Sequence, residues 1–316
     1  MDNVLAFGAA SAQAARVDGV FLLILVIGIF FFFLTQGMLI YFAVKYRRRL
    51  PGRDNETSTI TGSPLLEFLW ILIPSLVVVA IFFYGWRVYT DQRIPVAGAT
   101  EVYVNARQWL YEVKYPDGRT AINEIRVPAD KPVMFILSAA DVLHGFYLPD
   151  FRVKMDMIPG RVTTLWVQPD RPGSYQIFCT VYCGTGHSNM LARLIVMPPR
   201  EYAEWVEHGG REGGEGGEHE PLAARGERIL RNAGCLNCHA VDGKGQIGPN
   251  FRGLYGSKVP LEGGKSVTAD EEYLRESIVD PGAKVVKGFP NVMPTFKTTL
   301  SKEDIDAVTA YLKTLQ

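Results

Sequence analysis

The chain has 316 residues, enough for about two domains of ordinary size. Its 33 basic and 33 acidic residues balance, so the net charge gives no support to nucleic-acid binding. Apolar residues make up 47% of the chain, and many of them fall into two blocks near the N-terminal end. The composition therefore argues against a nucleic-acid partner and directs attention to a membrane.

The two apolar blocks predict two transmembrane helices, at about residues 20–44 and 65–89, with residues 1–19 as a separate segment before them. The first block includes the uncharged run Phe30–Leu34. At about 1.5 Å per residue, each predicted helix is long enough to cross a hydrocarbon core of about 30 Å. A pair of buried core helices is the alternative interpretation.

A basic cluster between the two blocks predicts the orientation of the chain. Lys45–Arg49 is rich in lysine and arginine, with few acids nearby. Because cytoplasmic loops are enriched in basic residues, we expect this loop in the cytoplasm and both termini on the opposite side. The predicted location is the inner membrane of a bacterium, crossed twice, with everything after Trp86 on the periplasmic or extracellular side.

Residues 95–198 predict an all-β domain. Short β-type runs are found at Glu101–Asn105, Pro132–Leu137, Thr163–Val167, Ser174–Phe178 and Leu191–Val196. Strong turn signals separate them, at Tyr115–Gly118 and Pro169–Gly173. Many short strands at close spacing indicate a sandwich or a barrel.

Residues 199–221 are predicted to be a linker, and residues 222–316 a helical domain. The stretch 208–219 is rich in glycine and glutamate and has no apolar side chain, so it cannot bury a core. Beyond it, helices are expected at about 223–233, at 269–279, and from Ser301, which begins an N-cap signature.

A C-x-x-C-H run in the helical domain is the attachment signature of a c-type haem. Cys235 and Cys238 would anchor the porphyrin, and His239 would supply an axial nitrogen. The segment Gly248–Phe251 resembles the loop of class I cytochromes c whose proline carbonyl orients that histidine. Met293 lies in a stretch that resembles their methionine loop and is the candidate sixth ligand. A zinc knuckle is the alternative, but the predicted compartment is extracytoplasmic and the sequence has no second C-x-x-C pair for it.

The other two cysteines belong to a compact group of soft ligands. Cys179, Cys183, His187 and Met190 fall within one short loop, and such a set favours copper. His144 is the candidate for a further ligand from elsewhere in the domain. Two thiolates exceed what a mononuclear site needs and fit a dinuclear centre. A structural zinc site or a disulfide between the two cysteines is the alternative.

Over about residues 20–198 the chain resembles subunit II of the haem–copper cytochrome c oxidases. The matching stretches are Gln108–Trp109, Tyr115–Asp117, His144 with Pro149, Lys154–Arg161 and the loop Cys179–Met190. The C-terminal part resembles the cytochrome c fused to this subunit in caa-type oxidases. The resemblance implies a multidomain membrane protein with a two-helix transmembrane hairpin, an all-β cupredoxin-like domain and an all-α cytochrome c domain.

The resemblance also implies the ligands of a dinuclear copper centre, CuA. Cys179 and Cys183 would bridge the two copper ions. His144 and His187 would each bind one of them, and Met190 would be a weak axial ligand.

Position 181 departs from the family pattern. The backbone carbonyl of Val181 would be the remaining weak copper ligand, and a carbonyl is present whatever the side chain. The family usually has glutamate here, and its carboxylate also reaches a magnesium site at the interface with subunit I. Magnesium is therefore in doubt, with Asp156 as a speculative substitute.

Two further residues gain roles from the resemblance. Trp109 is similar to the aromatic residue through which electrons reach CuA, although a core tryptophan explains it almost as well, and Tyr111 is a weaker candidate of the same kind. Glu67 opens the second predicted membrane helix, where the matching acid marks the mouth of a proton pathway into subunit I. A terminal acid at the membrane surface is the alternative for Glu67.

Together these expectations describe the electron-input subunit of a terminal oxidase. Electrons would pass from a cytochrome c or a quinol-oxidising complex through haem c and CuA to subunit I, which reduces O2 to water and pumps protons. Subunit III is an expected further partner. The alternatives are the matching subunit of a CuA-containing nitric oxide reductase and a free-standing electron carrier. A quinol oxidase subunit is disfavoured because such subunits usually lack the copper ligands.

Overall fold

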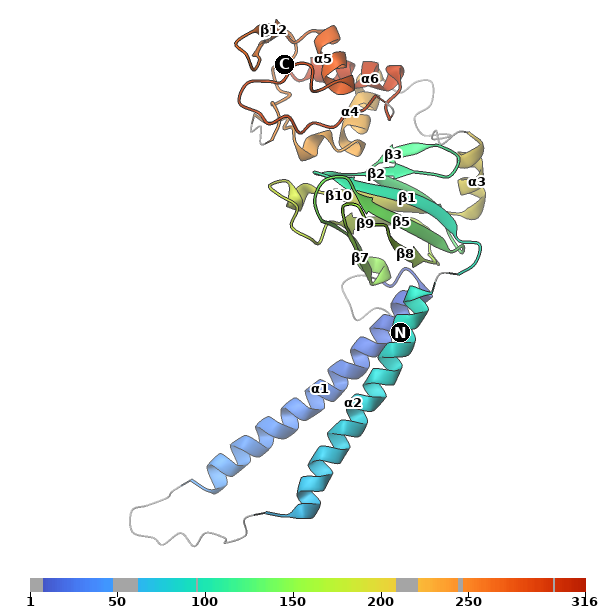
Figure 1. The fold of residues 1–316 in the computed structure, drawn as a ribbon, viewed down its shortest axis with the longest axis vertical. Coiled ribbons are helices and arrows are strands. Elements are labelled where there is room, and N and C mark those ends of the chain that lie inside the picture. Colours follow the sequence, from blue (N-terminus) through green and yellow to red (C-terminus); the bar gives the residue numbers. More distant parts are fainter. Residues whose placement is uncertain (1–7, 48–61, 95, 209–220, 244–246, 298) are drawn as a thin grey trace. The chain divides into compact units, whose positions relative to one another are not determined.

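The computed structural model describes residues 8–47, 62–94, 96–208, 221–243, 247–297 and 299–316. These residues form two compact units, which are treated separately (Figure 1). One unit is Ala12–Ile94, and the other consists mainly of Pro95–Gln316.

The unit Ala12–Ile94 is a pair of long helices, α1 (Ala12–Lys45) and α2 (Pro64–Arg93). Both are long and apolar enough to cross a membrane, as the sequence predicts. Helix α1 begins at Ala12, earlier than the predicted start near residue 20, because the alanine-rich stretch before the apolar block is itself a good helix former. Residues 48–61, which include part of the predicted cytoplasmic loop, lie outside the described residues.

The second unit begins with two five-stranded sheets. The first has the order β3-β2-β1-β5-β8. Its strands are β1 (Thr100–Arg107), β2 (Leu110–Lys114), β3 (Thr120–Ile122), β5 (Val133–Ala139) and β8 (Thr163–Val167). Strand β5 alternates buried and half-buried residues along its length, the pattern of a strand with one face on the core.

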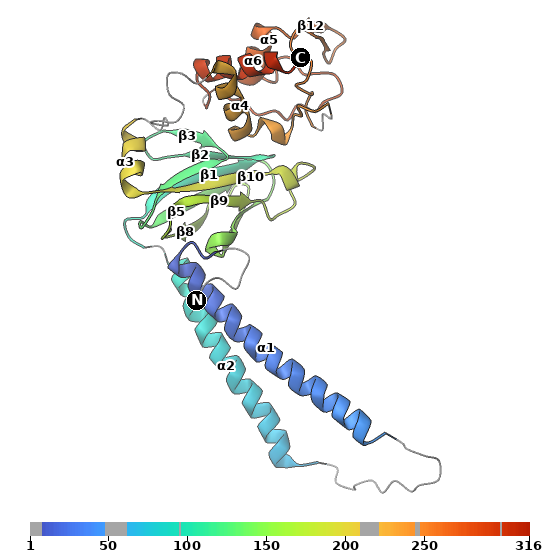
Figure 2. The ribbon, with the colours of Figure 1, turned by 180° about the vertical axis from the view of Figure 1, so that it is seen from behind.

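The second sheet has the order β4-β10-β9-β6-β7. Its strands are β4 (Glu124–Pro128), β6 (His144–Leu148), β7 (Val153–Met157), β9 (Gly173–Phe178) and β10 (Leu191–Met197). Apolar side chains from both sheets form one buried cluster that includes Phe135, Phe146 and Leu194. The predicted all-β sandwich is therefore confirmed (Figure 2).

The first part of the predicted linker is a helix instead. Helix α3 (Pro199–Glu207) lies where the linker was expected to begin. Its Trp205 is buried against the sandwich core and packs on Tyr115 at a ring distance of 5.5 Å. Tyr202, Trp205 and Val206 give this segment an apolar face, which the glycine-rich composition further along obscures. Residues 209–220 lie outside the described residues.

The C-terminal domain is built on three helices, α4 (Leu222–Asn232), α5 (Glu271–Val279) and α6 (Lys302–Thr314). They confirm the predicted helices, and Ser301 and Asp304 form a complete capping box at the start of α6. The domain is not purely helical, because β11 (Lys258–Pro260) and β12 (Ser266–Thr268) pair as a short hairpin. Gly226 lets α4 and α6 cross closely, since a Cβ there would lie 1.9 Å from the Ala307 carbonyl oxygen.

Candidate metal centre and haem cavity

The predicted metal-binding loop connects two adjacent strands of the second sheet. Strand β9 ends at Phe178 and β10 begins at Leu191. The Cys179 N–H donates to the Met190 carbonyl oxygen at 3.4 Å, which closes the base of the loop. His144 begins β6, which pairs with β9, so the sheet brings this distant residue to the loop. The structure thus brings the predicted ligands together.

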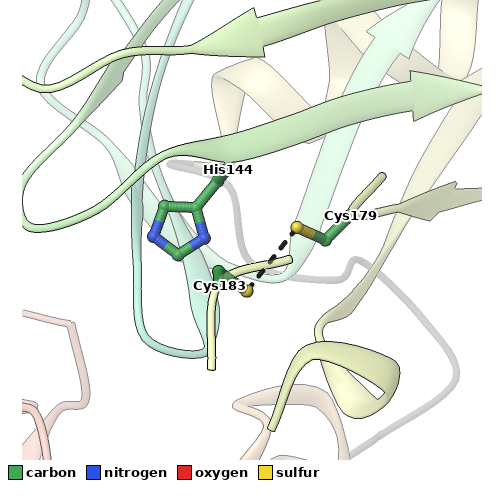
Figure 3. A group of neighbouring side chains, drawn as sticks. All are labelled: His144, Cys179 and Cys183. Atoms are coloured by element: carbon green, nitrogen blue, oxygen red, sulfur yellow. Dashed lines mark hydrogen bonds between the residues drawn. The ribbon is translucent and has the colours of Figure 1, made fainter. Parts of the chain in front are cut away.

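The sulfur and nitrogen atoms of these residues converge around Cys183. Its Sγ lies 3.7 Å from Cys179 Sγ, 3.5 Å from His187 Nδ1 and 3.9 Å from Met190 Sδ. The ligand atoms of His144, Cys179 and Cys183 all lie within 4.8 Å of one another, and the three residues are buried (Figure 3). The cysteines are unbonded thiols at a separation far above the disulfide length of about 2.05 Å, so the disulfide alternative is wrong for this structure.

His144 has one ring nitrogen held and one available. Its Nε2 lies 2.8 Å from the Asp141 carboxylate, whereas Nδ1 is buried without a hydrogen-bond partner. Burying an unpaired nitrogen is costly, and a metal ion would satisfy it. The orphaned nitrogen and the cluster of sulfurs therefore fit a copper centre.

The two thiols of the loop differ in their pKa. Burial opposes ionisation of Cys179, but the neighbouring His144 ring and a hydrogen bond from the Gly145 N–H outweigh it and lower its pKa. The pKa of Cys183 is raised by burial and by the neighbouring charge of Cys179. One thiolate is thus favoured without a cation, and a second requires the positive charge of a metal.

Asp141 is a functional residue that the sequence interpretation missed. Its carboxylate contacts His144 Nε2 and accepts from the backbone N–H of Gln108 at 2.8 Å and of Val142 at 2.6 Å. Burial raises its pKa, but these hydrogen bonds prevail and lower it. A carboxylate three residues before a ligand histidine was the available signal, because metal-binding histidines commonly donate to one.

Residues 108, 109 and 111 lie directly beside the loop. Gln108 Nε2 and Trp109 Nε1 both donate to the Cys183 carbonyl oxygen, at 2.8 and 3.1 Å. Tyr111 is fully buried and donates to the Gly145 carbonyl oxygen at 2.6 Å. Trp109 is also part of the sandwich core, as the alternative interpretation expects, and its role in electron entry stays a prediction.

The remaining predicted residues of this region are placed as follows. The Val181 carbonyl oxygen lies 3.2 Å from Cys179 Sγ, so it faces the centre. Asp156 is half exposed and lies 4.0 Å from Lys154 Nζ. Glu67 is exposed in the first turn of α2.

A large, mostly apolar cavity occupies the C-terminal domain, with an empty volume of about 1330 Å³ including its part open to solvent. Its mostly apolar lining suits the macrocycle of a haem. Cys235, Cys238, His239 and Met293 all line it. The structure therefore brings together the four predicted haem residues.

His239 is oriented for ligation. Its Nδ1 lies 2.7 Å from the Pro249 carbonyl oxygen, which leaves Nε2 free. The ring stacks on Phe251 at 4.4 Å, and a Cβ at Gly248 would lie 2.6 Å from its Cε1. The proline carbonyl thus holds the histidine as the sequence interpretation expects. Gln108, Trp109 and Leu110 of the sandwich also line this cavity.

Comparisons with known proteins identify the family of each part of the chain. Residues 4–88 match the family "Cytochrome C oxidase subunit II, transmembrane domain", and residues 100–197 match "Cytochrome C oxidase subunit II, periplasmic domain". Residues 223–316 match the family "Cytochrome c". The first two families together span both the paired helices and the β-sandwich.

Similar individual proteins carry the same name. Cytochrome c oxidase subunit 2 of Alkalihalophilus pseudofirmus is 33% identical over 280 residues, covering 86% of this chain and 79% of that protein. Its counterpart in Bacillus subtilis is 26% identical, covering 87% and 82%. The periplasmic domain of oxidase subunit II from Bradyrhizobium japonicum is a similar solved structure, with 30% identity, a TM-score of 0.35, and coverage of 36% of this chain and 95% of that one.

The candidate copper ligands lie within the residues that match the periplasmic domain, and the C-x-x-C-H run lies within those that match cytochrome c. The similarity to the Alkalihalophilus protein covers 86% of this chain. The chain therefore belongs to the family of cytochrome c oxidase subunit II, with a cytochrome c domain fused at its C-terminal side.

Proposed function

We propose that this chain receives electrons at haem c and passes them through a dinuclear CuA centre to the haem–copper subunit of its oxidase. As a cytochrome c oxidase subunit II, it is an electron-input subunit of a membrane complex and works with subunit I, where O2 is reduced. It carries copper and haem c. The observation that supports the dinuclear centre best is the convergence of three other soft ligands on Cys183 within 3.9 Å.

We assign the copper ligands from this convergence. Cys179 and Cys183 would hold the two copper ions together, and His144 would bind one of them through its orphaned Nδ1. His187 binds the other, and Met190 with the Val181 carbonyl oxygen completes the set. The copper pair supplies one-electron redox chemistry at a potential between donor and acceptor.

The surrounding residues keep this centre rigid. Asp141 fixes the ring of His144, and Gln108 with Trp109 holds the Cys183 carbonyl oxygen. Ligands fixed in advance by packing and hydrogen bonds need little rearrangement when the charge of the centre changes. This rigidity suits a site whose only task is to accept and release electrons.

In the cytochrome domain, Cys235 and Cys238 would anchor the haem, and His239 and Met293 would bind its iron. Histidine and methionine together raise the haem potential, which suits an acceptor of respiratory electrons. The donor is a cytochrome c or a quinol-oxidising complex, and subunit III is a further partner. The redox domains lie on the periplasmic or extracellular side of the bacterial cell membrane.

Magnesium finds little support among these residues. Val181 contributes a carbonyl and no carboxylate, and Asp156 is half exposed beside Lys154. The O2-reducing assignment is favoured over nitric oxide reduction because the similar proteins are cytochrome c oxidases. Oxygen and nitric oxide consumption by the purified complex tests that choice directly.

Glu67 opens α2 and is proposed as the mouth of a proton pathway into subunit I. Glu67→Gln should slow proton uptake and turnover while leaving reduction of haem c and CuA unchanged. Unaltered turnover would show that the carboxylate is only a membrane-surface acid.

The assignment as a whole is tested by metal analysis and visible and near-infrared spectra of the purified chain. Two copper ions and one covalently bound c-type haem per chain are expected. Zinc in place of copper, or a colourless matured protein, would refute the proposal.

A further inference from the structure

The sandwich and the cytochrome domain belong to one compact unit and share a buried apolar contact. Leu110 and Ile122 of the first sheet form a cluster with Ala233 and Phe296 of the cytochrome domain, and all four are buried. Ile247 of the cytochrome domain also belongs to the core cluster of the sandwich. A contact of this kind holds the haem cavity against the copper-binding domain.

Two polar contacts join the same surfaces. Arg193 of β10 donates to the Asn232 side chain at 2.9 Å. Asn237, which lies between the two haem-anchoring cysteines, donates through Nδ2 to the Trp109 backbone carbonyl oxygen at 3.3 Å. The chain comes close here because Gly234 has a φ of 75°, and a Cβ at that position would lie 2.3 Å from Asn123 Nδ2.

The contact of Asn237 differs from that of Asn232 because its partner, Trp109, is itself hydrogen-bonded to the copper loop. Trp109 donates through Nε1 to the Cys183 carbonyl oxygen at 3.1 Å. Cys183 is the residue on which the copper ligands converge, and Asn237 is one residue from Cys238. Asn237 and Trp109 therefore connect the haem attachment to the copper loop through two hydrogen bonds. Arg193 makes no such connection to the copper loop among the contacts of the described residues.

We propose that Asn237 is the bridging residue for electron transfer between the two redox domains, a role that rests on the proposed function above. Its side-chain amide couples the haem attachment to Trp109, and Trp109 couples it to Cys183. In this step one electron moves: haem iron is oxidised from Fe(II) to Fe(III), and the copper pair is reduced by one electron. No proton moves, and no bond forms or breaks at Asn237, Trp109 or Cys183.

The attachment chemistry leaves this position free for such a role. A C-x-x-C-H motif fixes the cysteines and the histidine and accepts any residue between them. The side chain of Asn237 is long enough for its amide N–H to donate to the Trp109 carbonyl oxygen. Trp109 itself is 8% exposed, so a separate donor protein has little access to its ring in the described structure.

The test compares Asn237→Leu with Asn232→Leu in the full chain, each of which removes one hydrogen bond from the same contact. Haem c is photoreduced, and reduction of the copper pair is followed by its near-infrared absorbance. Asn237→Leu should slow the transfer roughly tenfold relative to Asn232→Leu, equivalent to about 1.4 kcal/mol. Haem and copper content and both redox potentials should match wild type in both variants.

Hydrogen exchange in β2 reports whether the domains stay in contact, and it should change equally in the two variants. Equal transfer rates in the two variants, whether unchanged or equally slowed, would overturn the bridging role. Asn237→Asp keeps the shape and loses the donor, so it repeats the test if the leucine variant does not mature. Missing copper or haem in the wild-type chain would instead refute the proposed function.

Discussion

Cys179 and Cys183 are surrounded by hydrogen-bonding groups, whereas Cys235 and Cys238 line a mostly apolar cavity. The first pair lies at the end of a sheet, beside a histidine ring and backbone N–H groups. For Cys235, burial raises the thiol pKa to about 12, and burial also raises the pKa of Cys238. In the copper loop the pKa of Cys179 is lowered instead, while that of Cys183 is raised by burial and by the neighbouring Cys179.

This difference matches the two kinds of bond that the pairs make. A metal ion is bound by thiolates, so polar contacts that favour the ionised form prepare Cys179 for copper. A haem attached through thioether bonds needs no persistent negative charge on sulfur, and an apolar wall suits its macrocycle. The spacing of cysteines suggests each site, and the environment decides its chemistry.

The largest expected effect comes from removing one pair at a time. Cys183→Ser should abolish the near-infrared absorbance of CuA and lower oxidase turnover by more than about 100-fold, since changes even to the partners of metal ligands cost 10- to 100-fold. The c-type haem should remain. Joint replacement of Cys235 and Cys238 by alanine should give the reverse pattern in spectra and metal content. Loss of both cofactors in either variant would show that the two sites do not mature independently.

Asp141→Asn tests the polar surroundings of the copper pair. The carboxylate that holds His144 Nε2 would become a neutral amide, and copper affinity should fall by about 10- to 100-fold. Copper retained during titration with a chelator measures the effect. Asp156→Asn, an exposed carboxylate on β7, is the matched control and should retain copper as wild type does. Equal retention in both variants would contradict the role assigned to Asp141.

The copper and haem motifs could be predicted from the sequence because residue type and spacing alone identify most of their ligands. The C-x-x-C-H run and the loop after β9 each bring most of their ligands from one short segment. His144 could be proposed only as a candidate from elsewhere in the domain, because the sheet and not the spacing brings it to the loop. Asp141 was missed although it lies three residues before His144, and Asn237 was missed because its partner Trp109 is far away in sequence.

The fold divides in the same way. Runs of β-branched and aromatic residues predicted β1, β5, β8, β9 and β10. Strand β6 was missed because it contains Gly145 and is followed directly by Pro149, and both residues resemble turn signals. Helix α3 was missed because its apolar face is short. A helix of this length is unstable alone, and the packing of Trp205 on the sandwich stabilises it.

Gly248→Ala tests the haem side of the comparison. The added Cβ would lie 2.6 Å from His239 Cε1, so the ring must move away from its place beside Pro249. Crowding of this kind costs about 1–3 kcal/mol, and it should also perturb the low-spin spectrum of the haem. Gly282→Ala, where the nearest atom lies 3.8 Å from the added Cβ, is the control. An unperturbed spectrum in Gly248→Ala would show that the cavity accommodates the added methyl group without displacing the His239 ring.

The smallest expected effect concerns the helix pair that supports the haem cavity. Asp304 accepts hydrogen bonds from Arg225 of α4 at 2.6 Å and from the Ser301 N–H at 3.1 Å. Burial raises its pKa, but these partners outweigh burial and lower it. Asp304→Asn should therefore cost about 1 kcal/mol of stability at neutral pH, as loss of a helix cap does.

The pH dependence of the unfolding free energy tests whether the charge of Asp304 is stabilising. A carboxyl whose pKa is lowered by folding stabilises the protein above its unfolded pKa of about 3.9, and this contribution is lost as the pH falls through the folded value. The unfolding free energies of wild type and Asp304→Asn, followed by haem absorbance in denaturant, should converge in acid. A double-mutant cycle with Arg225→Met isolates the ion pair from the cap. A difference that persists unchanged below the folded pKa would assign the stability to shape and not to charge.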